Sequence, residues 1–202
     1  MARSAFDTDI IKFVCIIRFS RKGGKKDDME ERKRNLLKRL ESFFKEDEDI
    51  EEASLFSAEE LEIPVDMLRV LVTGYGPQLI DILAEYSFLP LPGEADEVWY
   101  FSSVLTIETD IPREKAAALS NAIARLNFFM PYGGFCLSPE GDMLTYKSVT
   151  ALRSDEQDDT LYKDIELSAD TALLVPENFT DSLLRILDGR LSLSEFIEML
   201  PE

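Results

Sequence analysis

The feature of this sequence that most constrains its fold is an alternating segment followed at once by a proline-started helix. In residues 98–111, large apolar side chains take one parity, and mostly polar side chains take the other. This period of two is typical of a β-strand with one buried and one solvated face. Pro112 favours a helix start, and apolar residues then recur at helical spacing from Ala116 to Leu126. We therefore expect an α+β protein.

Other segments predict further elements of both kinds. We expect strands at residues 10–19 and 67–73, a basic amphipathic helix at 28–45, a helix from Pro77 to Tyr86, a hairpin of 135–137 with 143–149, and a short helix at 183–187 ended by Gly189. Residues 161–175 fit a helix or a strand, and we favour a helix. Ser192 and Glu195 form a capping-box pattern ahead of a last helix.

An acidic segment marks the best candidate boundary. Residues 46–62 carry nine carboxylates, a charge density that resists compaction. We expect an acidic linker or loop there. The predicted organisation is an N-terminal strand and basic helix in residues 1–45, the linker in 46–62, and an α+β core domain with a helical C-terminal tail in 63–202.

The composition excludes whole classes of chemistry. Histidine is absent, which removes imidazole general bases, Ser-His and Cys-His nucleophiles and histidine-ligated metals. Cys15 and Cys136 lie in apolar runs without a partner cysteine nearby, as buried free thiols do in a reducing compartment. The longest apolar run, residues 10–19, is too short for a membrane span and lacks the features of an export signal. We expect a cytoplasmic protein that spans no membrane and carries no cofactor.

Charge is divided unevenly along the chain. Residues 1–39 hold 12 basic and 6 acidic side chains (net +6), whereas the remainder has a net charge of −24. Such an acidic body repels phosphate backbones, so we expect no nucleic-acid partner. The basic side chains of the first helix are predicted on its solvent side, with anion binding as the alternative: Arg32, Lys33, Arg34, Lys38 and Arg39.

Two acidic runs are the remaining candidates for catalysis. Residues 46–52 and 155–159 are dense in carboxylates, but neither has the alternating spacing and central glycine of an EF-hand. We interpret both as solvated loops and expect no metal site and no catalytic residue. The alternative is a carboxylate-dependent, metal-assisted hydrolase or transferase.

Aromatic side chains gather around the alternating strand and the end of the helix that follows it. They are the candidate protein-binding residues: Trp99, Tyr100, Phe101, Phe128, Phe129 and Tyr132. Consecutive residues of a strand point to opposite faces, so the aromatic strand residues need cover on both faces to be buried. A face left uncovered on an acidic body is typical of a surface that binds another chain.

Part of this order resembles a known family. A strand, a proline-started helix ending in Leu126-Asn127, Gly134-Phe135 opening a hairpin, and residues 142–146 on its return strand are similar to the YbjN-like family and, more remotely, to class I type III secretion chaperones. The resemblance implies an antiparallel sheet flanked by helices, frequent dimerisation and a protein-binding role. The family places three strands between its first two helices, where our prediction has only residues 98–111. No functional residue is transferable, because these families have no catalytic motif.

Together these observations predict a noncatalytic protein-binding module of chaperone-like or regulatory type. Its partner would be a protein or peptide, a second copy of the chain included.

Overall fold

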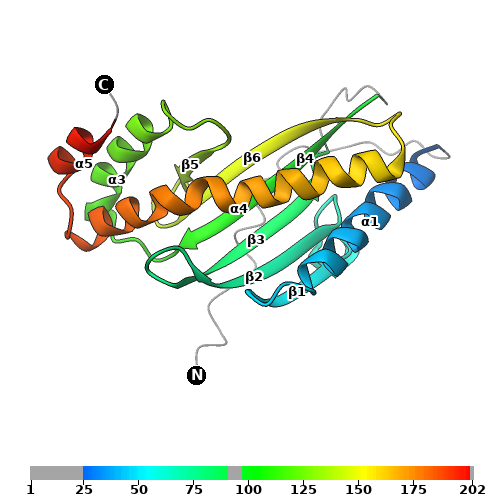
Figure 1. Cartoon of the computed structure of the whole chain (residues 1–202), viewed down its shortest axis with the longest axis horizontal. Coiled ribbons are helices and arrows are strands. Elements are labelled where there is room, and N and C mark those ends of the chain that lie inside the picture. The colour runs from blue at the N-terminus through cyan, green and yellow to red at the C-terminus, as the bar shows by residue number, and fades with distance from the viewer. Residues whose placement is uncertain (1–24, 91–96, 201–202) are drawn as a thin grey trace.

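The computed structural model describes residues 25–90 and 97–200 (Figure 1). Within these ranges the chain forms one six-stranded antiparallel sheet, in the order β1-β2-β3-β4-β6-β5, together with five helices. The elements are α1 (Lys25–Phe44), β1 (Ile50–Phe56), α2 (Ala58–Leu61), β2 (Met67–Tyr75), β3 (Ile80–Phe88), β4 (Val98–Glu108), α3 (Arg113–Leu126), β5 (Gly134–Leu137), β6 (Leu144–Arg153), α4 (Asp158–Asp188) and α5 (Leu193–Met199). The expected α+β fold, an antiparallel sheet flanked by helices, is confirmed. The strand predicted at residues 10–19 lies outside the described residues.

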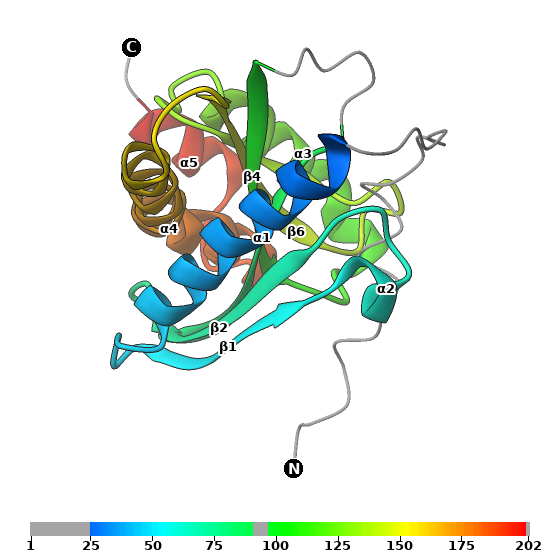
Figure 2. The same cartoon turned by 90° about the vertical axis from the view of Figure 1, so that its right-hand side faces the viewer.

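The two longest helices lie across the same face of a strongly twisted sheet (Figures 1 and 2). α1 contacts β1, β2 and β3, and α4 contacts β4 and β6. α3 packs against β5, α4 and α5 at one end of the molecule. Each of these two helices therefore covers a different part of the same sheet face. We call the opposite face the outer face.

The alternation in β4 places its large apolar side chains as the sequence predicts, but the expected solvated face is only partly exposed, because Ser102 and Thr106 on it are 5% and 3% exposed. Trp99, Phe101, Leu105 and Ile107 are buried at 5% exposure or less, on the face that α4 covers. The neighbouring β3 places Tyr86 and Phe88 on the same face, where their rings lie 6.0 and 5.7 Å from the ring of Phe101. The centre of the core is therefore an aromatic cluster between the sheet and the helices.

The helix predicted from Pro77 to Tyr86 is wrong, because this segment contains β3. Residues Gly74, Gly76 and Leu79 all have φ between 52° and 67°, which turns the chain back on β2. The apolar side chains after the turn fit a period of two as well as a helical period, and pairing with β2 and β4 decides between them.

The expected acidic linker at residues 46–62 contains structure instead. β1 pairs with β2 along its length, and Ser57 and Glu60 form a capping box that starts α2. Glu51 and Glu52 are exposed while Ala53 is buried, so the carboxylates point to solvent at the edge of the sheet. Glutamate side chains on an edge strand do not prevent its backbone from pairing with β2. They discourage another chain from pairing with its free edge.

The segment left open between helix and strand is helical, as we favoured. It is part of α4, which continues through Pro176 to Asp188, so the short helix expected at 183–187 is not separate. Thr180 Oγ donates to the Pro176 carbonyl oxygen within the helix. Gly189 ends the helix with φ 79°, and the Ser192–Glu195 capping box that starts α5 is confirmed.

Candidate functional site

The structure separates the six aromatic residues proposed as a binding surface. Trp99 and Phe101 are each 1% exposed and belong to the core, so a partner cannot reach them in the folded protein. Tyr100, between them, points to the outer face and is half-buried. The prediction of a protein-binding role is therefore wrong for Trp99 and Phe101, because the helices cover them.

The other three aromatic residues all lie in the connection between α3 and β5. Phe128 is 84% exposed and Phe129 is 37% exposed, and their rings meet edge to face with centroids 5.2 Å apart. Tyr132 follows in the same connection to β5. We call residues 127–134 the aromatic turn.

Hydrogen bonds fix the aromatic turn on the hairpin that follows it. Asn127 pairs with the backbone of Phe135 twice: its Nδ2 donates to the carbonyl oxygen (2.8 Å), and its Oδ1 accepts from the amide (2.9 Å). The Tyr146 hydroxyl donates to the carbonyl oxygen of Tyr132, and the Tyr132 and Thr150 hydroxyls are 2.6 Å apart. Both ends of the turn are thus tied to the sheet.

Gly133 allows the aromatic turn to lie close to β6. Its φ is 63°, and a Cβ at this position would lie 2.3 Å from the Tyr146 hydroxyl oxygen and 2.7 Å from the Lys147 carbonyl oxygen. Only glycine fits both the space and the left-handed conformation without strain. The exposed phenylalanines are therefore held by a defined backbone.

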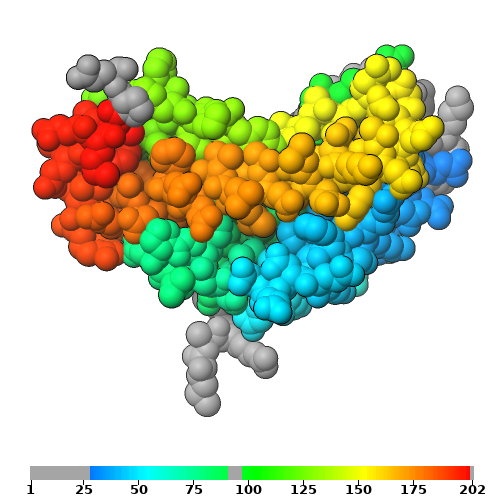
Figure 3. Space-filling view, viewed as in Figure 1, coloured from blue at the N-terminus to red at the C-terminus, as the bar shows by residue number. Residues whose placement is uncertain are grey.

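An incomplete sheet edge lies beside the turn. β5 pairs only with Leu144 to Lys147, so residues 148–153, which we call the β6 edge, have β4 on one side and no strand from the described part of the chain on the other. The Ser154 amide donates to Glu97 on the β4 side. By alternation, the backbone groups of Val149, Ala151 and Arg153 point to the open side. In the space-filling view the outline is hollowed between α3 and the far end of β6 (Figure 3).

The basic residues of α1 form the predicted solvent-side stripe only in part: Lys38 and Arg39 are exposed, whereas Arg32, Lys33 and Arg34 are not. Lys33 is 6% exposed, and its Nζ lies 5.3 Å from the centroid of the Trp99 ring. Arg32 covers the same ring at 5.1 Å, pairs with Asp158 at 2.6 Å and donates to the carbonyl oxygens of Ser154 and Glu156. These side chains fasten α1 to the acidic connection between β6 and α4.

Two further α1 arginines also face acidic partners. Arg39 pairs with Asp159 at 3.0 Å and lies over the Tyr162 ring, and Arg34 pairs with Asp66 at 2.8 Å. The anion-binding alternative is therefore weaker for this helix, because at least three of its arginines already have carboxylate partners.

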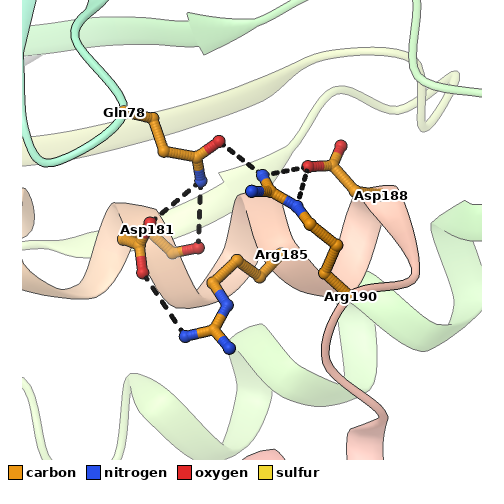
Figure 4. Close-up of polar contacts among 5 residues, drawn as sticks. All are labelled: Gln78, Asp181, Arg185, Asp188 and Arg190. Carbon is orange, nitrogen blue, oxygen red and sulfur yellow. Dashed lines mark hydrogen bonds and ion pairs between the residues drawn. The ribbon is translucent and has the colours of Figure 1, made fainter.

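A second polar cluster joins the β2–β3 turn to the end of α4 (Figure 4). Gln78 donates to Asp181 at 3.0 Å and accepts from Arg190 at 2.6 Å. Arg190 also bonds Asp188, and Arg185 lies 3.9 Å from Asp181. Each arginine here has an aspartate partner. The cluster therefore connects the β2–β3 turn to the end of α4 and does not form an anion site.

Within the described residues, carboxylates do not converge on a metal site. No three acidic or cysteine side chains in residues 25–90 and 97–200 come close enough together to hold a metal ion. In the acidic run that begins at Asp155, three members pair with arginines: Asp155 with Arg153, and Asp158 and Asp159 with α1. Their charge is used to attach elements to one another.

Burial changes the acidity of two carboxyl groups. On the outer face, burial raises the pKa of Glu85 above its ordinary value, although the guanidinium of Arg69, 2.9 Å away, opposes the rise. Burial also raises the pKa of Asp170 on α4, with Glu166 and Asp47 adding repulsion. Asp170 therefore has two carboxylate neighbours, whereas Glu85 has the guanidinium of Arg69.

Sequence reasoning missed the β6 edge. The signal was present in the hairpin, since the predicted first strand of three residues was much shorter than its return strand, which leaves part of the longer strand without a partner. The aromatic and alternating pattern indicates the faces of a sheet and does not indicate its edges. Val149, 49% exposed, was therefore not among the candidate residues.

Comparison with known proteins leaves the family open. No family model matches the sequence, and no curated protein matches it. A similar solved structure is the crystal structure of an uncharacterized protein from Methanothermobacter thermautotrophicus, with 13% identity, a TM-score of 0.35, and coverage of 77% of this chain and 98% of that chain. A likeness of this size identifies neither a family nor an activity. None of the helices in the described ranges is long and apolar enough to cross a membrane.

Proposed function

We propose that this protein is a noncatalytic, cytoplasmic protein-binding module of chaperone-like or regulatory type, and that the aromatic turn is its contact site. The observation that carries the proposal is the exposure of Phe128 and Phe129 on a backbone held from both sides. A solvent-exposed phenylalanine pair costs solubility and contributes nothing to the core, which is typical of a contact surface.

The rigidity of the turn favours tight contact. Burying one phenylalanine side chain in an interface contributes about 1.5–3 kcal/mol from apolar area. The two hydrogen bonds between Asn127 and the Phe135 backbone, and the bond from the Tyr146 hydroxyl to Tyr132, hold the turn in place before binding. Less conformational entropy is then lost when a partner arrives.

The charge of the molecule favours a basic or neutral partner. The net charge of −18 attracts cationic surfaces at long range and repels phosphate backbones. We therefore propose a protein or peptide partner, a second copy of the chain included, and no nucleic acid.

The resemblance to the YbjN-like family supports the same role. Because residues 80–88 are a strand, three strands (β2, β3 and β4) lie between the short helix α2 and the Pro112 helix, and β1 comes before α2. The resembled family places three strands between its first two helices. Those proteins bind other proteins and have no catalytic motif.

The test uses an array of basic, amphipathic 15-residue peptides probed with labelled full-length protein. We expect saturable binding to a subset of the peptides. Replacing Phe128 and Phe129 together by serine should weaken it about 10- to 30-fold, the effect of losing a hot spot worth about 2 kcal/mol.

The matched control is Leu79→Asn, which removes an exposed apolar side chain (73% exposed) elsewhere on the surface and suits a positive φ. Equal binding by wild type, double variant and control would exclude the aromatic turn. Absence of binding to every peptide, together with a strictly monomeric protein in sedimentation equilibrium, would reject the proposed function.

A further inference from the structure

Two exposed leucines lie on α4 with a spacing of seven residues. Leu167 and Leu174 are 67% and 64% exposed, whereas Ile165 on the opposite side of the helix is fully buried. A spacing of seven places two side chains on one stripe of a helix, about 10 Å apart along its axis. In Figure 3, α4 lies uncovered across the front of the molecule. We call the two leucines, with Asp170 and Thr171 between them, the leucine stripe.

The side chains that border these leucines are mostly acidic. Neighbours on a helix surface are three or four residues apart. Asp164 and Asp170 therefore border the first leucine, and Asp170 and Glu177 border the second. The basic neighbour is Lys163, beside the first leucine. The apolar stripe is thus surrounded by negative charge along most of its length.

These carboxylates differ from those in the first turn of α4. Asp158 and Asp159 pair with α1 arginines at 2.6 and 3.0 Å. Among the described residues, no lysine or arginine nitrogen lies within 4.0 Å of the three carboxylates that border the leucines. Burial raises the pKa of Asp170, and repulsion from Glu166 and Asp47 adds to the rise. The described part of the chain therefore leaves the negative charge around the stripe without a cation.

A second copy of this chain does not fit the leucine stripe. An antiparallel pair of α4 helices that places Leu167 against Leu174 also places Asp164 against Glu177. A parallel pair places Asp170 against the same residue of the other copy. Like charges in contact are unfavourable, and each molecule has a net charge of −18. The charge around the stripe favours an occupant that brings both apolar and basic side chains.

We propose that the leucine stripe binds a basic amphipathic helix of another protein. Apolar side chains of that helix, at spacings of three and four residues, pack on the two leucines. Its flanking lysines and arginines face the carboxylates that border the stripe, which gives the surface its preference for a basic helix. This second contact surface lies on a different element from the aromatic turn and goes beyond the proposed function.

The test uses a labelled 18-residue peptide of leucine, alanine and lysine, in which the leucines form one helical face and the lysines flank it. Fluorescence anisotropy with the full-length protein measures the dissociation constant. A peptide of the same composition in scrambled order has no leucine face, so it reports attraction by charge alone. We expect the scrambled peptide to bind about tenfold more weakly, because it cannot pack on both leucines together.

The apolar contacts are tested by replacing both leucines. Leu167→Gln with Leu174→Gln should weaken binding of the leucine-faced peptide roughly tenfold or more, and glutamine preserves the helix propensity of α4. The matched control, Leu79→Asn with Met199→Gln, removes two exposed apolar side chains elsewhere and should change the dissociation constant by less than about twofold. Wild-type affinity in the α4 variant, or equal binding of the ordered and scrambled peptides, would overturn the proposal.

The acidic border is tested by neutralising two of its members. Asp170→Asn with Glu177→Gln should weaken binding about threefold and reduce its dependence on salt, because two charges beside the peptide are removed. Glu59→Gln with Glu198→Gln is the control, since it removes the same charge from exposed positions on α2 and α5. The same salt dependence in the two variants would show attraction to the whole molecule and contradict a site on α4.

The variant with Phe128 and Phe129 replaced by serine separates this surface from the aromatic turn. It should bind the leucine-faced peptide with wild-type affinity, because the leucine stripe is intact. Loss of binding in that variant, with no loss in the α4 variant, would reject the leucine stripe and leave the aromatic turn as the contact site.

Discussion

The buried aromatic cluster and the aromatic turn contain the same kind of side chain and differ in what surrounds it. Phe101 is 1% exposed and has Tyr86 and Phe88 as ring neighbours, whereas Phe128 is 84% exposed and has Phe129 as a ring neighbour. In the cluster, helices and strands from distant parts of the chain supply the cover. In the turn, hydrogen bonds fix the backbone and leave the rings in solvent. The same residue type thus stabilises the fold at one place and is available for contact at the other.

The largest expected effect compares one ring from each region. Phe101→Ala should lower the free energy of unfolding by about 3–5 kcal/mol, because it leaves a cavity in a packed core. Phe128→Ala should change it by no more than about 0.5 kcal/mol. Urea unfolding followed by circular dichroism measures both, and similar losses in the two variants would remove the distinction between cluster and turn.

The next effect tests whether the turn is as rigid as its contacts indicate. Gly133→Ala adds strain at a positive φ and a clash with Tyr146, so we expect a loss of about 2–4 kcal/mol. Gly74→Ala is the control, since its φ is 65° but no atom lies within 4 Å of the added Cβ. A loss at Gly133 no greater than at Gly74 would show that the turn yields to the added methyl group.

A smaller effect concerns the side chains that cover the cluster. Arg32→Met removes three polar contacts to the β6–α4 connection and the cation above Trp99, and should cost about 1–2 kcal/mol. The emission of Trp99, the sole tryptophan, should change with it. Lys45→Gln serves as the control, because it breaks the ion pair between Glu41 of α1 and the residue that follows the helix. Unaltered stability and emission in Arg32→Met would make the α1 contacts incidental.

The smallest expected effect is on the pH dependence of stability, and it compares a buried carboxyl group with an exposed one. Burial raises the pKa of Glu85, so its folded form binds a proton more readily than its unfolded form, and its contribution to stability falls as the pH rises above about 4.5. The stability of wild type relative to Glu85→Gln should therefore increase as the pH is lowered toward that value.

Glu60 provides the opposite sign at the surface. Hydrogen bonds from Ser57 lower the pKa of its carboxyl group, so wild type should lose stability relative to Glu60→Gln as the pH falls below about 4.5. Urea unfolding at several pH values measures both differences. The same sign for the two variants would refute the assignment of these pKa shifts to burial and to hydrogen bonding.

Local patterns predicted several elements correctly because each depended on neighbours in sequence. The alternation around Trp99 gave β4 and its buried parity, Pro112 gave the start of α3, and the Ser192–Glu195 pair gave the cap of α5. β3 was predicted as a helix because its apolar residues fit both periods. Its strand partners, which decide the matter, are neighbours in space.

The candidate site was predicted only in part for the same reason. Phe128, Phe129 and Tyr132 were identified as aromatic residues near a helix end, but their exposure depends on where α3 and β5 leave them. Trp99 and Phe101 were assigned to the same surface because the sequence does not show that α1 folds back with Arg32 and Lys33 over the ring.

By itself, the sequence determined the α+β class, the excess of negative charge, the lack of imidazole chemistry and the parity of the central strand. Composition and short-range periodicity suffice for these properties. The tertiary structure alone decided which aromatic rings are covered, that residues 50–56 pair as an edge strand, and that β6 extends beyond the end of β5. Such features arise from contacts between residues far apart in the chain, where a small difference in length or register changes which groups meet.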